Sequence, residues 1–124
     1  MNINNPLPAD RMYTDDGDIV HCKVLDILTW NMDTANFKAI THGLGDAWKR
    51  IIGVSAWIRN DANNLRNPTG WFRDFPDPGL ISVGIEYWDD TFIYIVRRTG
   101  GAADIAGYSS TAFSRGQIFV WYRE

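Results

Sequence analysis

The chain has 124 residues, of which 45% are hydrophobic and 22% are charged, and it contains six tryptophans, five tyrosines and six phenylalanines. This composition is that of a globular protein rather than a disordered or fibrous one, and the length suits one domain. Twelve basic and 15 acidic residues give a formal net charge of -3. The chain lacks the basic excess that binding to nucleic-acid phosphates requires, so we expect no nucleic-acid partner.

Cysteine content and hydropathy exclude further classes. Cys22 is the single cysteine, so the chain can form neither an intrachain disulfide nor a multi-cysteine zinc site. The longest nearly apolar stretch, residues 51–58, is far shorter than the ~20 residues of a membrane-spanning helix. The chain begins with neither the basic nor the apolar region of a signal peptide. We therefore expect the chain to be made in a cytoplasm and not to insert into a membrane.

The first half of the chain predicts an arm, three strands and one helical turn. Residues 1–18 contain two prolines and four aspartates without a hydrophobic period, so we interpret them as an extended arm that precedes a domain of residues 19–124. Residues 19–30 and 37–41 have the pattern of strands. Asp46 is placed to cap a single helical turn that ends at Arg50.

The third strand, residues 51–59, shows the clearest alternation in this half and is expected to lie inside a sheet. One face of this strand is predicted to point into the core, while Ile51 and Trp57 lie on the opposite face. A two-layer sandwich needs only one buried face per strand. The extra apolar face therefore makes Trp57 and Ile51 the candidates for a subunit interface. The residues of the predicted core face are Ile52, Val54, Ala56 and Ile58.

The second half of the chain predicts a long loop, a hairpin and a final strand. Residues 65–79 contain three prolines and three aromatic residues and read as an irregular loop. Residues 81–88 and 92–98 form a β-hairpin, residues 99–115 are small and polar, and residues 117–122 form the last strand. We therefore predict an all-β protein, an antiparallel β-sandwich of about six to eight short strands with little helix.

Five segments in this order resemble those of a known family. They are WNMDT (residues 30–34), THGL (41–44), IIGVSAWIRND (51–61), RRTGG (97–101) and RGQIFVWY (115–122). Together they resemble small β-sandwich modules of bacteriophage and prophage structural proteins, at the tips of fibres, spikes or other virion appendages. The resemblance covers residues 19–124. The strand spacing is also, more loosely, similar to the H-type lectin sandwich, a trimeric glycan-binding fold.

The resemblance implies a virion protein, made in the host cytoplasm, that forms a homotrimer and acts in host attachment. Its implied partners are other virion proteins and a host cell-surface glycan, and it implies neither catalytic residues nor a cofactor. Two alternatives stay open. One is a capsid or tail decoration protein that cements neighbouring subunits through its acidic arm without binding a receptor, and the other is a secreted bacterial lectin.

The chemistry-bearing residues favour a protein that is not an enzyme and holds no metal. His21 and His42 are far apart in sequence, and no hydrolase, zinc-protease or phosphate-binding motif gives either a partner. His21 and Cys22 are adjacent in a strand and point to opposite faces. The aspartate pairs lie in predicted turns, where carboxylates usually accept hydrogen bonds from backbone amides.

One loop has the composition of a ligand-binding segment. Flat aromatic rings can stack on sugars or proteins, and charged neighbours can bind hydroxyl or peptide groups. The same aromatic side chains could instead fold back and plug one end of the sandwich, and the sequence leaves both interpretations open. This loop is richer in aromatics than the corresponding loop of the phage family. The candidate ligand-binding residues are Trp71, Phe72, Arg73, Asp74 and Phe75.

Overall fold

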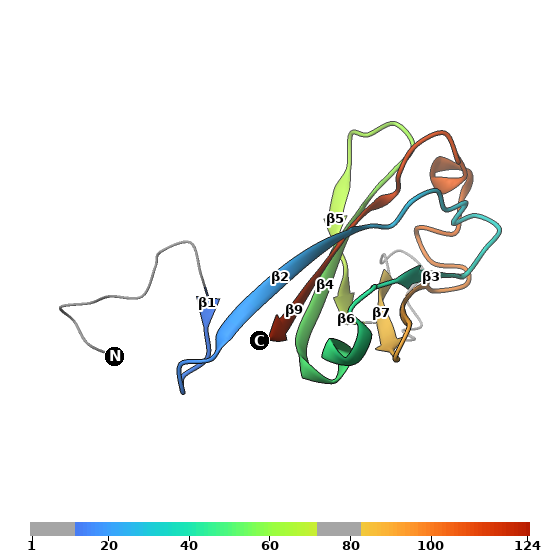
Figure 1. The fold of residues 1–124 in the computed structure, drawn as a ribbon. Helices are drawn as coiled ribbons and strands as arrows, with labels where there is room; N and C mark the ends of the chain where they lie inside the picture. The colour runs from blue at the N-terminus through green and yellow to red at the C-terminus, as the bar shows by residue number, and fades with distance from the viewer. Residues whose placement is uncertain (1–11, 72–82) are drawn as a thin grey trace.

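A computed structural model describes residues 12–71 and 83–124, which form two β-sheets packed face to face (Figure 1). One sheet has five strands in the order β1-β2-β9-β4-β5, and the other has four in the order β3-β8-β7-β6. The prediction of an all-β sandwich is confirmed. Within the described ranges no helix is long and apolar enough to cross a membrane.

The elements are short, and neighbouring strands are antiparallel except β6 and β7, which are parallel. The five-stranded sheet contains β1 (Met12–Tyr13), β2 (Ile19–Asp26), β9 (Gly116–Arg123), β4 (Ile51–Arg59) and β5 (Arg66–Pro68). The four-stranded sheet contains β3 (Phe37–Thr41), β8 (Phe92–Arg97), β7 (Val83–Trp88) and β6 (Gly70–Trp71). The helical segments are two 3-10 turns, η1 (Gly45–Arg50) and η2 (Ala106–Tyr108). The strands β1, β5 and β6 could not be predicted from the sequence, because two or three residues cannot display an alternation.

The core lies between the two sheets. Ile118 and Val120 of β9 are fully buried, and they belong to one hydrophobic cluster with Ile93 and Ile95 of β8. These residues alternate with outward-facing neighbours along their strands, as expected for two inner sheet faces. Each fully buried isoleucine stabilises the fold by roughly 1.5–3 kcal/mol. The alternating β8 and β9 segments therefore hold the sandwich together.

The N-terminal boundary differs from the prediction. Met12 pairs with Val20 and Tyr13 pairs with Ile19, so β1 and β2 form a hairpin. Its turn is closed by the N–H of Thr14, which donates to the Asp18 carbonyl over 2.8 Å. Residues 12–18 are therefore part of the five-stranded sheet and not of an extended arm. The remainder of the predicted arm, residues 1–11, lies outside the described residues.

Two other boundaries have local causes. The strand predicted over residues 19–30 ends at Asp26, because Leu28 adopts the left-handed backbone conformation with φ 67°. The Asp26 carboxylate accepts the Leu28 N–H over 2.8 Å and holds that turn. The predicted helical turn is present as η1, but its N-terminal cap is Leu44 and no side chain caps it, so the role predicted for Asp46 is wrong.

Candidate functional site

The outer face of the five-stranded sheet, which points away from the other sheet, is apolar at its centre. Phe119 and Trp121 alternate with the buried residues of β9, so their rings project outward, with ring centroids 6.1 Å apart. Val24 of β2 lies opposite Phe119 and is 52% exposed. We call this surface the β2-β9-β4 face, and its members are Cys22, Val24, Ser55, Trp57, Phe119 and Trp121.

Small residues of β4 lie beside the two β9 aromatics. Ser55 is the register partner of Phe119, and Gly53 is the partner of Trp121. A Cβ atom built on Gly53 would lie 3.8 Å from the Trp121 ring, so the ring covers the backbone there. The aromatic side chains consequently stand above their neighbours while staying half-buried. Large rings raised above small neighbours are typical of the centre of a protein interface.

Opposite charges flank the β2-β9-β4 face on its two sides. Asp26 ends β2 on one side. The aspartates of the β1-β2 turn lie at the opposite end of β2, where Asp18 is 4.0 Å from the Arg123 guanidinium. Arg66 of β5 lies on the other side, with its guanidinium carbon 4.9 Å from the centre of the Trp57 ring. At the Asp26 end of the face a carboxylate therefore lies on the β2 side and a guanidinium on the β5 side. This pattern suits head-to-tail contacts between copies, in which Asp26 of one copy meets Arg66 of the next.

The structure separates the two residues predicted to form a subunit interface. Trp57 lies on the face opposite Ala56 and Ile58, which are buried in the core, so it faces outward as expected. Ile51 instead packs against the core cluster, and Ile52 is 49% exposed. A β-bulge between residues 51 and 53 reverses the alternation at this end of β4. The placement predicted for Ile51 and Ile52 is therefore wrong, because the partly buried Ile51 packs on the core and Ile52 faces outward.

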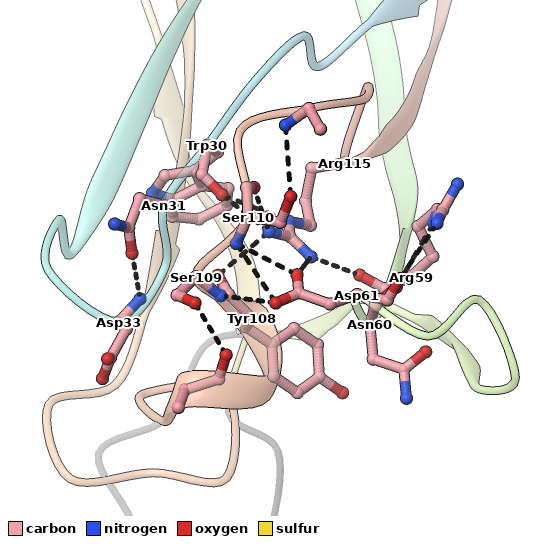
Figure 2. Close-up of polar contacts among 12 residues, drawn as sticks. Trp30, Asn31, Asp33, Arg59, Asn60, Asp61, Tyr108, Ser109, Ser110 and Arg115 are labelled. Carbon is pink, nitrogen blue, oxygen red and sulfur yellow. Dashed lines mark hydrogen bonds and ion pairs between the residues drawn. The ribbon is translucent and has the colours of Figure 1, made fainter.

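A buried arginine organises the loops at one end of the sandwich (Figure 2). Arg115, which has no exposed surface, donates both Nε and Nη2 to the Trp30 carbonyl, over 3.2 and 3.0 Å. Its Nη2 also donates to the carbonyls of Tyr108 and Ser110, each over 2.9 Å. Its Nη1 donates over 3.0 Å to the Asp61 carboxylate and to the Arg59 carbonyl, which ends β4. One side chain thus fixes three connections that are distant in sequence.

Asp61 completes this network from the loop after β4. Its carboxylate accepts the backbone N–H groups of Ser109 and Ser110 over 3.1 Å, in addition to the Arg115 guanidinium. Burial raises the pKa of the Asp61 carboxyl, but the hydrogen bonds from Arg115 and from the two serine amides lower it more. The net result is a pKa below the ordinary value of 3.8. The loop after β4 is therefore held in place by the ionised form of the Asp61 carboxylate.

We expect the Asp61→Asn variant to melt several degrees below wild type at pH 7, with the difference shrinking as the pH falls from about 4 towards 2. A carboxylate whose folded pKa is lowered contributes its full stability above the unfolded pKa, and loses it as the pH falls through the folded value. Thermal melting followed by circular dichroism at both pH values measures the difference. Asp46→Asn, at an exposed aspartate of η1, is the control and should match wild type throughout. If the melting temperatures of Asp61→Asn and wild type differ as much at pH 2 as at pH 7, the ionised Asp61 carboxylate does not stabilise the loops.

A second buried arginine holds the same end from the other sheet. Arg97 of β8 is 6% exposed and donates Nε to the Met32 carbonyl over 2.5 Å. Its Nη2 pairs with the Asp104 carboxylate over 3.2 Å. The N–H of Met32 in turn donates to the Tyr108 carbonyl over 2.9 Å. Arg97 and Arg115 therefore lock together the connection after β2 and the connection before β9.

These two arginines carry only a weak signal in the sequence. Each of them lies at the end of a strand, and each pairs with an aspartate in a connecting loop, Asp104 or Asp61. Such Arg and Asp residues beside turns usually remain on the surface. Only the convergence of backbone carbonyls reveals that these guanidinium groups are buried anchors rather than contact surfaces.

The histidines are placed apart and have structural partners. His42 is buried, its Nε2 lies 2.9 Å from the Asp89 carbonyl, and its Nδ1 accepts the Leu44 N–H over 3.1 Å. His21 lies beside the Tyr122 ring, with centroids 5.4 Å apart. In the part of the chain that the structure describes, no three His, Cys, Asp or Glu residues gather in a group that could hold a metal ion.

The predicted ligand-binding loop is described only at its start. The backbone of Trp71 belongs to β6 and pairs in parallel with Ile85 at the edge of the four-stranded sheet. The other four candidates lie outside the described residues, so the binding and plug interpretations both stay predictions. Those residues are Phe72, Arg73, Asp74 and Phe75.

Comparison of the chain with protein-family models, with curated proteins and with solved structures gives no match.

Proposed function

We propose that this protein is a non-enzymatic bacteriophage virion protein that forms a homotrimeric fibre tip, spike tip or surface decoration and acts in attachment to the host surface. The resemblance of residues 19–124 to virion appendage modules suggests the setting. The observation that carries the proposal is the β2-β9-β4 face, an apolar surface with Asp26 on its β2 side and Arg66 on its β5 side. A surface of this kind fits assembly into a larger particle better than catalysis.

The chemistry of the face favours contact between identical copies. Its centre offers the rings of Trp57, Phe119 and Trp121, which contribute large apolar areas when they are covered. Charges of opposite sign on the two sides of one face are self-complementary in a ring, since each copy meets its neighbour in the same way. A closed ring of three copies would bury these aromatics around its axis.

Light scattering on the purified protein should give a mass near three chains. Val24→Glu and Trp57→Glu should both lower this mass, because each would bury an unpaired charge between copies. Val24 is 52% exposed in the single chain, so the substitution should leave the fold of the monomer intact. Tyr87→Glu changes a ring that is 49% exposed on the other sheet, and serves as the matched control with an unchanged mass. A sharp monomer at micromolar concentration would refute the trimer.

A second candidate function is a cementing role on the capsid or tail without a receptor. Two exposed aspartates of the β1-β2 turn, Asp15 and Asp16, favour it, because they could dock on a basic neighbour of the particle. Binding assays separate the two roles. Affinity of the isolated protein for whole host cells supports attachment, whereas binding only to particles that lack this protein supports cementing.

A further inference from the structure

The outer face of the four-stranded sheet holds a cavity of about 400 Å³ at the end of β8. Its volume falls within the range of small-molecule sites, about 300–1,000 Å³. Apolar and hydrogen-bonding side chains both line it. The lining residues are Asn36, Phe37, Glu86, Val96, Arg98 and Thr99, with part of Arg97.

The sheet register explains the shape of the cavity. Val96 is the register partner of Phe37 on one side and of Gly84 on the other. Gly84 contributes no side chain, so the bottom of the cavity is formed by Val96, which is 8% exposed. Phe37 stands beside Val96 and is 54% exposed. The cavity therefore presents one flat apolar ring next to a shallow apolar base.

A β-bulge turns two adjacent residues of β7 towards the same surface. Regular alternation from the core residue Ile85 would point Glu86 outward and Tyr87 inward. The register shift between residues 85 and 87 instead makes Tyr87 the partner of Tyr94 on the outer face, and Glu86 and Tyr87 are both exposed. Bulges commonly redirect side chains at functional sites. Here the bulge adds the Tyr87 ring to the outer face, next to the Glu86 carboxylate that lines the cavity.

An aromatic strip continues from the cavity along β8. The Tyr87 and Tyr94 rings lie 4.3 Å apart, and Phe92 lies 5.9 Å from Tyr94. From Val96 to Phe92 the strand covers about 13 Å, at ~3.3 Å per residue. The cavity and the aromatic strip together are therefore longer than a single six-membered ring. It also differs from the β2-β9-β4 face, because its aromatics include two tyrosines and its cavity carries an amide, a hydroxyl, a guanidinium and a carboxylate.

We propose that this surface binds an oligosaccharide, with one sugar ring in the cavity and the next over Tyr87 and Tyr94. Sugars combine apolar ring faces with many hydroxyl groups, and the surface offers exposed aromatic rings beside donors and acceptors of both charge signs. The carboxylate of Glu86 accepts hydroxyl hydrogens, while the amide of Asn36 donates to hydroxyl oxygens. The inference rests on and deepens the attachment role proposed above, and it places the ligand site on the sheet opposite the proposed assembly face.

Backbone amide NMR spectra test the site directly with defined sugars. Glucose, galactose, rhamnose, N-acetylglucosamine and N-acetylgalactosamine are each titrated to 50 mM, with galacturonate as an anionic probe. At least one of them should shift the amides of residues 36–37, 84–87 and 94–99. Phe37→Ala and Glu86→Gln should each weaken that binding at least tenfold. Leu65→Ala, a change at a residue that is 47% exposed in the β4-β5 connection, is the control and should leave it unchanged.

The outcomes separate this inference from the trimer. No shift with any of the six sugars, shifts confined to other residues, or shifts that persist in Phe37→Ala and Glu86→Gln would overturn the sugar site, whatever the oligomeric state. A shift with galacturonate alone that Phe37→Ala and Glu86→Gln abolish supports the site and assigns it to an acidic sugar. A monomer by light scattering together with these cavity shifts would refute the assembly and leave the site standing.

Discussion

Gly116→Ala is expected to prevent the protein from folding, or to lower its unfolding free energy by about 3 kcal/mol or more. A Cβ atom at Gly116 would lie 1.9 Å from the backbone oxygen of Trp57 and 3.1 Å from the Cα of Ile58. Both contacts are with the backbone of β4, the neighbouring strand, so no side chain can move aside. Relief would require β9 to separate from β4 next to the fully buried Ile118.

A glycine in the same pair of strands provides the control. Gly53 of β4 would place a Cβ atom 3.8 Å from the Trp121 ring, which is an ordinary contact distance. Gly53→Ala should therefore stay within roughly 1 kcal/mol of wild type in urea unfolding. If Gly116→Ala unfolds at the same urea concentration as Gly53→Ala, the close approach of β9 to β4 is wrong.

Arg115→Met should cost about 3–5 kcal/mol, which corresponds to a melting temperature lowered by ten degrees or more. The methionine fills part of the space but donates no hydrogen bond. The carbonyls of Trp30, Tyr108 and Ser110 would each lose the Arg115 donor, and the Asp61 carboxylate would lose its cation. The Tyr108 carbonyl and the Asp61 carboxylate would keep backbone N–H donors, so most of the expected loss comes from the carbonyls of Trp30 and Ser110 and from the charge of Asp61 left without a cation.

Two further variants identify the cause of this loss. Arg115→Lys keeps the charge, but one ammonium cannot reach acceptors in so many directions, so we expect it to restore only part of the stability. Arg123→Met removes an arginine whose side chain is 47% exposed and which pairs with Asp18 over 4.0 Å. It should change the unfolding free energy by at most about 0.5 kcal/mol. Equal melting temperatures for Arg115→Met and Arg123→Met would contradict the anchoring role.

The sequence by itself determined the fold class and the position of the main strands. Alternation over residues 51–59 and 117–122, and the β-rich run that begins at residue 92, correspond to β4, β9 and β8. These strands pack one face on the core, and a period of two is the direct consequence of that burial. For the same reason Trp57 could be assigned to the outer face, because in the sequence it alternates with Ala56 and Ile58, which point into the core.

Only the tertiary structure decided the details that shape the surfaces. The bulges in β4 and β7 depend on the pairing of neighbouring strands, so the alternation could not show that Ile51 points inward or that Tyr87 points outward. The cavity beside Phe37 brings together residues of three strands, and its composition follows from their register. Arg115 is buried because carbonyls from distant loops converge on it, and the pattern of residues around position 115 does not encode that convergence.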